Sequence, residues 1–442
     1  MLKRDLSKLD GYATIIGMMI GAGIFVAIGE AGQDAGPSTV FAYLLLGPIT
    51  LLLALPYVIF QSTSLGNLTG GAYIHISRTF KNHYVAFIVM WLTWVTYLGV
   101  IAVLSLSVGR YLQASFPFLN PKIIASLCLA LFYIINLTGV KQFGRMQRMM
   151  FYVLIASIIV IVLPGLSHIQ ASNFSPLLPN GWSGFFKALP ILFFAYAGFD
   201  ALSQTAGETK DARKSLPRIF VIGISVSVVL YIGISLIVFG TLPYSSVVIS
   251  QAPVVDAARS FLPFGTLVVT IAALMAFLST INACMLVPSR ILYAFAQDRV
   301  APSFLSNLSE RFGTPYISLT INFVIAMVLI WTKNMEFLIG ISMQSLIILY
   351  FAECVSLACL PFVNKPLWRQ VSYNISKKWV VIGGVVGALA LIVLYVNIPN
   401  PVSVLLLTWV GIGTIFYVLE KTQGKKASFD YETNLTGYLH ND

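Results

Sequence analysis

Long apolar stretches alternate with short polar segments along almost the whole chain. An α-helix needs about 20 apolar residues to cross a bilayer, and these stretches approach or exceed that length. The pattern therefore predicts an all-α integral membrane protein with about 12 membrane-spanning helices. The predicted spans are residues 12–34, 39–65, 84–112, 122–139, 148–168, 184–206, 217–241, 264–297, 316–332, 336–361, 379–397 and 401–420.

The first span, within Gly11–Gly32, has glycine residues near its middle, where a continuous helix would be expected. Each glycine costs a helix interior ~1 kcal/mol relative to alanine. An unpaired backbone group in lipid costs more, unless protein or cavity water satisfies it. An interruption at Gly21–Gly23 thus predicts backbone groups that meet a ligand. Close packing against a neighbouring helix is the alternative interpretation.

A second interrupted segment, Phe193–Lys210, lies in the sixth span, where apolar residues give way to Gly198 and Asp200. Each interrupted span is therefore the first of a set of five spans, a pattern typical of transporters with inverted repeats. We expect one transporter domain, 1–442, with a first repeat at 12–168, a second at 184–361 and two further helices at 379–420.

Composition and charge indicate a membrane protein that meets lipid rather than nucleic acid. Hydrophobic residues make up 58% of the chain and charged residues 10%, whereas soluble domains average ~25% charged residues. The net charge is +11, and most Lys and Arg residues fall in alternate loops that include both terminal segments. The positive-inside rule then predicts a multi-pass protein of the cell membrane with both termini in the cytoplasm.

No motif indicates a cofactor, a metal centre or an enzyme active site. The four cysteines lie in apolar segments without metal-ligand spacing, and the four histidines form no cluster along the sequence. No Walker, zinc or nucleophile-elbow pattern is present. A channel would show polar stripes or charged rings along its spans, whereas these spans are mostly apolar and their interruptions are paired.

Four short motifs occur along the chain in this order: GAGIF at 21–25, GGAY at 70–73, FFAYAGFD at 193–200 and SRILYA at 289–294. With them the chain resembles the amino acid–polyamine–organocation (APC) superfamily, in particular its cationic amino acid transporter and ApcT-like branches. The resemblance implies a LeuT-like five-plus-five inverted repeat with broken helices 1 and 6. It also implies secondary active amino acid transport by alternating access, with a substrate site between these helices and Phe194 as an aromatic lid.

The broken helices give this site a physical basis for binding a zwitterion. N–H groups that begin a half-helix attract a carboxylate, and carbonyl groups that end a half-helix accept hydrogen bonds from an ammonium group. No charged side chain is required, and the alanine residues there favour a small neutral or aliphatic amino acid. The expected substrate-binding residues are Ile20, Gly21, Ala22, Gly23, Ile24, Phe194, Ala195, Ala197 and Gly198.

Two carboxylates within predicted spans are candidates for gating or coupling, together with the lid residue Phe194. Asp200 is one of them, because a charged side chain at membrane depth usually has a function. The alternative is a structural role, in which Asp200 caps the second half-helix of the sixth span. Glu353 in the tenth span is interpreted either as a proton carrier or as a hydrogen-bond partner of an adjacent helix.

Ser279 and Thr280 in the eighth span are candidate sodium ligands, because hydroxyl groups here hold the cation in sodium-coupled members of the superfamily. Hydrogen bonding to their own helix backbone is the alternative. ApcT-like members instead carry a lysine in the fifth span, and the stretch Arg148–Pro164 contains none. A glutamate common in the second span is replaced here by Gln61–Ser64.

Aromatic residues at a spacing of three mark one face of the third span: Trp91, Trp94 and Tyr97. We interpret them as packing or interfacial residues, with pocket lining as the alternative.

Together these features predict a permease, not an enzyme, that works by proton-coupled symport or by exchange. The expected partners are an amino acid, membrane lipid and a coupling ion, either a proton or sodium. Sodium coupling, polyamine transport on the same fold and a transport-dead amino acid sensor remain the alternatives.

Overall fold

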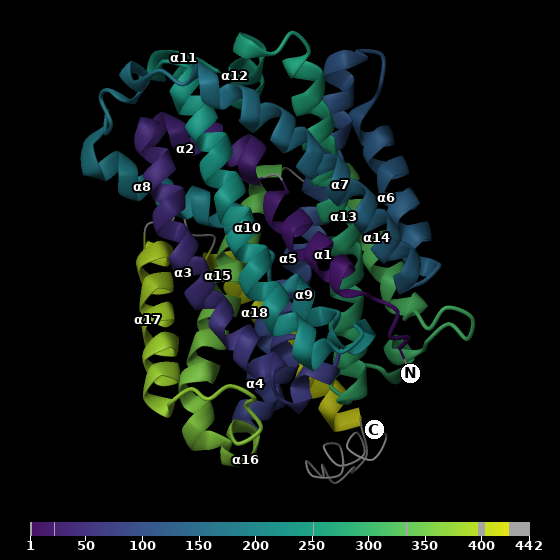
Figure 1. The fold of residues 1–442 in the computed structure, drawn as a ribbon. Coiled ribbons are helices and arrows are strands. Elements are labelled where there is room, and N and C mark those ends of the chain that lie inside the picture. The colour runs from purple at the N-terminus through teal and green to yellow at the C-terminus, as the bar shows by residue number, and fades with distance from the viewer. Residues whose placement is uncertain (1, 22, 251, 333–334, 397–402, 424–442) are drawn as a thin grey trace.

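The computed structural model describes residues 2–21, 23–250, 252–332, 335–396 and 403–423. Within these residues the chain forms a bundle of helices, and the only β-pairing is an isolated bridge between Leu6 and Thr209 (Figure 1). Eight of the described helices are long and apolar enough to cross a membrane. Apolar side chains such as Leu127 and Val229 are exposed on the outer faces of the bundle. The structure is therefore that of an all-α, multi-pass membrane protein.

The long helices follow the predicted spans closely, and most ends agree within about four residues. Their bounds are α1 (Lys8–Ile20), η1 (Gly23–Ala27), α2 (Ile28–Ala35), α3 (Thr39–Gln61), α5 (His83–Ser115), α6 (Pro121–Leu137), α7 (Val140–Gly165), α8 (Gly181–Tyr196), α9 (Ala201–Gln204), α10 (Ala212–Thr241), α13 (Gly265–Gln297), α14 (Tyr316–Thr332), α15 (Met335–Val363), α17 (Lys377–Val396) and α18 (Ser403–Gln423).

Short helices in the connections are not predicted by the pattern of apolar spans, because each is too short to cross a membrane. One of them, α4, follows a turn in which Gly70 and Gly71 have φ angles of 127° and 46°, a region that favours glycine. The short helices and single turns are η2 (Gly36–Ser38), η3 (Ser64–Asn67), α4 (Ala72–Phe80), η4 (Leu166–His168), η5 (Ala171–Phe174), η6 (Ala206–Glu208), α11 (Tyr244–Ile249), α12 (Pro253–Phe261), η7 (Ser303–Ser306) and α16 (Lys365–Trp368).

The first and sixth spans are interrupted where the glycine pattern predicts. In the first span, α1 ends at Ile20 and the chain resumes as the π-helical turn η1 and then α2. In the sixth span, α8 ends at Tyr196, Ala197 is extended and Gly198 has a φ of 102° before α9 begins. That φ lies in the region that L side chains disfavour, so the break requires glycine at position 198.

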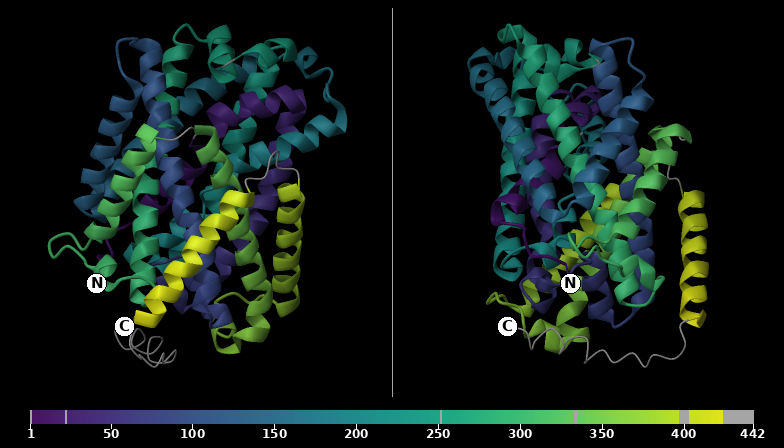
Figure 2. Two further views of the ribbon diagram at one scale, coloured as in Figure 1. Left: turned by 180° about the vertical axis from the view of Figure 1, so that it is seen from behind. Right: turned by 90° about the vertical axis from the view of Figure 1, so that its right-hand side faces the viewer.

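The two interrupted spans lie within the bundle. α1 packs against α7, α10 and α13, and α8 packs against α2, α3 and η1. α11 and α12 lie at one end of the molecule, whereas the N-terminus lies at the opposite end, together with the described end of α18 (Figure 1). α18 crosses the back of the bundle obliquely and packs against α5 (Figure 2).

Candidate substrate and coupling site

The two helix breaks lie against each other through backbone. A Cβ atom placed on Gly23 would lie 2.5 Å from Cα of Ala195, so η1 and the end of α8 approach as closely as glycine permits. The hydroxyl of Tyr231 on α10 bridges the two breaks, because it contacts the carbonyl oxygen of Met19 and lies 2.6 Å from that of Ala195. A hydroxyl has one proton to donate, so the two carbonyl groups share it.

The expected substrate-binding residues gather at this contact. Ile20, Ile24 and Ala195 are buried, and Phe194 is half-buried. Two of the carbonyl groups at the end of α8 have partners in this conformation, since that of Phe194 accepts from Ala197 N at 3.2 Å and that of Ala195 accepts from the Tyr231 hydroxyl. Ala22 lies outside the described residues. Gly21, Ala197 and Gly198 are also buried at the two breaks.

Asp200 does not cap the second half-helix through its side chain. Its carboxylate instead accepts hydrogen bonds from the hydroxyl groups of Tyr97 on α5, at 2.5 Å, and Tyr350 on α15, at 2.7 Å. The Tyr350 hydroxyl in turn accepts from Gly198 N at 3.0 Å. Charge-assisted hydrogen bonds of this kind compensate a carboxylate for the loss of water. They tie the break in the sixth span to two helices on either side.

Glu353 is buried and pairs with a histidine that sequence spacing did not connect to it. Oε1 of Glu353 lies 2.9 Å from Nδ1 of His75 on α4, and Nε2 of His75 lies 3.3 Å from the side-chain nitrogen of Gln61 on α3. Phe60 stacks on the imidazole ring with centroids 4.7 Å apart. Oε2 of Glu353 and Oε1 of Gln61 have no hydrogen-bond partner among the described residues.

Aromatic rings connect the Glu353 pair to the Asp200 cluster. Tyr57 on α3 contacts the ring of His75 at 5.7 Å between centroids and that of Phe199 at 5.6 Å. Phe199 stacks on Tyr350 at 4.8 Å. Tyr350 lies three residues before Glu353 on α15, so both side chains are on the same helix face. The two buried carboxylates therefore belong to one contiguous polar and aromatic region.

The candidate sodium ligands have protein partners. The Ser279 hydroxyl accepts a hydrogen bond of 2.7 Å from Nε2 of Gln147 on α7, and the same amide group donates to Ala13 O on α1 at 3.3 Å. The Thr280 hydroxyl bonds to Gly17 O at 3.2 Å and to Ala276 O, one turn back on its own helix, at 3.0 Å. A side-chain amide thus lies between α1, α7 and α13.

That amide belongs to a chain of amide groups within the bundle. Asn282 on α13 donates to Oε1 of Gln147 at 2.8 Å and accepts from Asn136 on α6 at 3.1 Å. Sequence reasoning missed Gln147 because it precedes the stretch Arg148–Pro164 and is flanked by basic residues, which suggest an interface. Tyr231 and Tyr350 were missed because nothing local distinguishes them from packing residues.

A second cluster of charged side chains surrounds Asp298, the residue that follows α13, at the end of the bundle that carries the N-terminus. Arg78 on α4 forms a bidentate pair with Asp298, at 2.5 and 2.8 Å, and Nδ1 of His83 lies 3.3 Å from the same carboxylate. Burial alone would raise the pKa of Asp298, but the hydrogen bonds and positive charges of Arg78 and His83 outweigh it and lower that pKa below its ordinary value.

Comparisons with known proteins agree with this architecture. The model of the amino acid permease family matches residues 6–418. The chain is 24% identical to a methylthioribose transporter of Bacillus subtilis over 95% of its own length and 93% of the relative's. It is 26% identical to a branched-chain amino acid permease of the same species, over 72% of each chain.

A plant relative is longer. The chain is 29% identical to the chloroplastic cationic amino acid transporter 9 of Arabidopsis thaliana over 70% of its own length, and the match spans 58% of that relative. The family match, by contrast, covers nearly the whole chain. The chain therefore belongs to the amino acid permease family, a family of membrane transporters and not of enzymes.

Proposed function

We propose that the protein is a secondary active transporter that moves an amino acid across the cell membrane by alternating access. The observation that carries this proposal is the backbone contact between the two interrupted spans at Gly23 and Ala195. Half-helix ends at such a contact present N–H groups to a carboxylate and carbonyl groups to an ammonium group. The carbonyl groups shared by Tyr231 would accept from the ammonium group once the hydroxyl releases one of them.

A small neutral or aliphatic amino acid fits this site best. Ala195 and Ala197 are small, and Asp200 is already bonded to Tyr97 and Tyr350, so it offers no free carboxylate to a cationic substrate side chain. The branched-chain permease among the relatives agrees with this choice. The methylthioribose transporter matches nearly the whole chain, so methylthioribose belongs in any substrate panel.

The coupling ion in this proposal is a proton, bound at the Glu353–His75 pair. An amide nitrogen only donates, so the contact with Gln61 makes Nε2 of His75 the acceptor and Nδ1 the donor to Glu353. The unpartnered Oε2 of Glu353 can then take up a proton. Nε2 of His75 can do so as well, if the Gln61 amide rotates and presents its oxygen.

The surroundings of this pair connect it to the substrate site. The other titratable groups that interact with it are Tyr57 on α3, Cys354 on α15 and Asp200. Protonation of Glu353 would remove a negative charge from the region that also holds Asp200 and the Tyr350–Gly198 contact. Binding of a proton and closure of the break at Gly198 would therefore influence each other.

Sodium is the less favoured ion in this proposal. The Gln147 amide donates to the Ser279 hydroxyl and to a carbonyl group of α1, which are the groups that a sodium ion would need. An amide N–H can hold such oxygen atoms together without a cation. We further propose that both termini are cytoplasmic and that residues 12–168 and 184–361 form two inverted repeats.

Uptake by purified protein in proteoliposomes tests the function. Labelled amino acids and methylthioribose would be offered with a proton gradient, with a sodium gradient, with neither, or with internal amino acid for exchange. Saturable uptake of a small neutral amino acid driven by protons is expected. No flux in any condition, together with substrate-induced thermal stabilisation, would favour the sensor; sodium-driven uptake would overturn the coupling proposal.

A further inference from the structure

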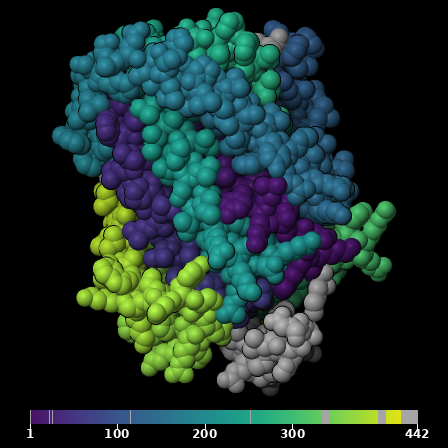
Figure 3. Space-filling view, in the orientation of Figure 1, coloured from purple at the N-terminus to yellow at the C-terminus, as the bar shows by residue number. Residues whose placement is uncertain are grey.

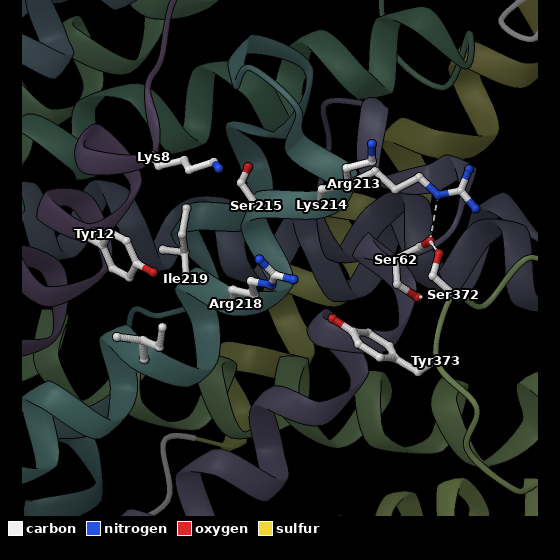
Figure 4. A pocket seen from close by; sticks show the side chains of 11 residues that line it. Lys8, Tyr12, Ser62, Arg213, Lys214, Ser215, Arg218, Ile219, Ser372 and Tyr373 are labelled. Carbon is white, nitrogen blue, oxygen red and sulfur yellow. Dashed lines mark hydrogen bonds between the residues drawn. The ribbon is translucent and has the colours of Figure 1, made fainter.

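A pocket of about 700 Å³ lies on the outer surface between α1, α10, the end of α3 and the segment that precedes α17. Figure 4 shows its lining, with the guanidinium group of Arg218 pointing into the space between Tyr12 and Tyr373. Four cationic side chains line it and, among the described residues, no acidic one does. The four are Lys8, Arg213, Lys214 and Arg218.

The positive charge of this pocket is not neutralised within the described part of the chain. None of its four cationic side chains forms an ion pair there. Arg213 is held by backbone, since it donates to Ser62 O at 2.7 Å and to Gln370 O at 3.1 Å. Lys8, Lys214 and Arg218 are exposed, and Figure 4 draws no hydrogen bond from their side chains to the other lining residues. Like charges around one cavity repel, so an anion between them would be stabilised.

The position of the pocket along α10 indicates a membrane boundary. Beyond Arg218 the same helix exposes a row of large apolar side chains, from Val221 and Ile222 to Val229. Val229 lies about 16 Å along the helix axis from Arg218. In the space-filling view α10 forms a continuous exposed strip between α3 and α1 (Figure 3). Cationic side chains next to an exposed apolar row are typical of the boundary between acyl chains and headgroups.

The lining itself is amphipathic, which distinguishes a lipid from a free anion. Ile222 contributes apolar surface and also belongs to the exposed apolar row of α10. Tyr12 and Tyr373 present rings with a polar tip, as aromatic residues do at membrane interfaces. A dissolved phosphate ion would need the cations alone, whereas a phospholipid would also use the apolar wall.

We propose that this pocket binds the phosphate headgroup of an anionic phospholipid from the leaflet on the side of the N-terminus. The phosphate lies between Lys8, Lys214 and Arg218, and the glycerol and upper acyl chain lie along Ile222. The lipid thereby links α1, which carries the first helix break, to α10. This site is independent of the proposed transport activity, because its test measures lipid binding alone.

The test uses the purified full-length protein in detergent and fluorescently labelled phosphatidylglycerol. Lys214→Gln with Arg218→Gln removes two cations, and binding is expected to weaken about tenfold or more. The charge-conserving pair Lys214→Arg with Arg218→Lys should bind nearly as the parent does. A matched control, Lys141→Gln with Arg145→Gln, removes two exposed cations from the start of α7 and should leave binding unchanged.

Competition separates the sources of the phosphate group. Unlabelled phosphatidylglycerol should displace the probe, whereas phosphatidylcholine and millimolar inorganic phosphate should not. Displacement by inorganic phosphate at the same concentration as lipid would overturn the lipid assignment in favour of a free anion. An equal loss of binding in the α7 control pair would show attraction by net charge and would also overturn the proposal. Size-exclusion profiles confirm that each variant is folded.

Discussion

Arg290 on α13 donates two hydrogen bonds to the carboxylate of Glu208 in η6, at 3.0 Å from Nε and 2.7 Å from Nη2. Both side chains are at most 2% exposed. Nearby, Leu6 N donates to Glu208 O at 3.0 Å, so the N-terminal segment is attached to the same turn. This ion pair joins the segment that follows the broken sixth span to α13, and we expect it to keep the end of the bundle that carries the N-terminus closed.

Loss of the Glu208 charge is expected to open the end of the bundle that carries the N-terminus. Glu208→Gln leaves the buried Arg290 uncompensated, which typically costs roughly 3–5 kcal/mol. The native thiol of Cys284 reports the opening, because it is buried on α13 with its sulfur 3.9 Å from that of Met18. In a variant with Cys284 as the only cysteine, labelling by a water-soluble maleimide should accelerate about tenfold or more. A tenfold increase in the open population requires a shift of only about 1.4 kcal/mol in the free energy of opening.

The matched control for this experiment is Asp34→Asn. Asp34 pairs with Lys187 at 2.7 Å, but the lysine is 64% exposed, and such surface pairs contribute ~0–1 kcal/mol. Labelling of Cys284 should proceed at the parent rate in this variant. Equal labelling rates in Glu208→Gln and the parent would show that the buried pair does not control access.

A side chain at Gly23 is expected to abolish substrate binding while the protein remains folded. Any Cβ there meets backbone atoms of Ala195 at 2.5 Å, so Gly23→Val must push η1 away from α8. Gly411→Val on α18 is the control, since a Cβ there meets nothing within 4 Å. Substrate-induced thermal stabilisation should vanish in the first variant and persist in the second. Unchanged binding in Gly23→Val would place the substrate elsewhere.

The sequence predicted the spans well, because lipid imposes a strong and local constraint on apolar length. The predicted span 316–332 coincides with α14 at both ends, and the glycine residues located both helix breaks. The polar partners could not be predicted in the same way. His75 and Glu353 are 278 positions apart. The spacing of Tyr97 indicates a packing or interfacial residue, with pocket lining as the alternative, and does not identify Asp200 as its hydrogen-bond partner. Such pairs depend on which helices become neighbours, which no local pattern encodes.

Transport is expected to be independent of sodium. Since the Gln147 amide contacts Ser279 and the backbone of α1, replacing sodium by a large organic cation should leave uptake unchanged. Gln147→Ala should lower stability by about 1–3 kcal/mol, because it removes the donor to the buried Ser279 hydroxyl and one acceptor of Asn282. A sodium dependence that disappears in Ser279→Ala with Thr280→Ala would instead identify these hydroxyl groups as ion ligands.

Acid is expected to weaken the contact between α4 and the end of α13. The folded-state pKa of Asp298 lies below its ordinary value of ~3.9. Its contribution to stability is therefore complete well above that ordinary value and is lost as the pH falls towards the folded-state pKa. Asp298→Asn should destabilise the protein by about 3 kcal/mol at pH 7. This value is near the lower end of the cost of removing one partner from a buried ion pair.

Thermal unfolding in detergent at several pH values measures this effect. The difference in midpoint between the parent and Asp298→Asn should be largest near neutral pH and should shrink below about pH 4. A difference that stays constant down to pH 3 would mean that the variant acts through packing and not through the charge of Asp298.

Neutralisation of Glu353 is expected to separate transport from proton coupling. Glu353→Gln keeps a side chain that can bond to His75, but its amide cannot take up a proton. Uphill uptake driven by a proton gradient should be lost, whereas exchange of internal for external substrate should persist within about threefold, because the contacts at Gly23 and Ala195 are unaffected. The exposed Glu30 on α2 offers the control, and Glu30→Gln should keep both activities. If Glu353→Gln still accumulates substrate against its gradient, the proton binds elsewhere, and Asp200 with its two tyrosine partners becomes the next site to neutralise.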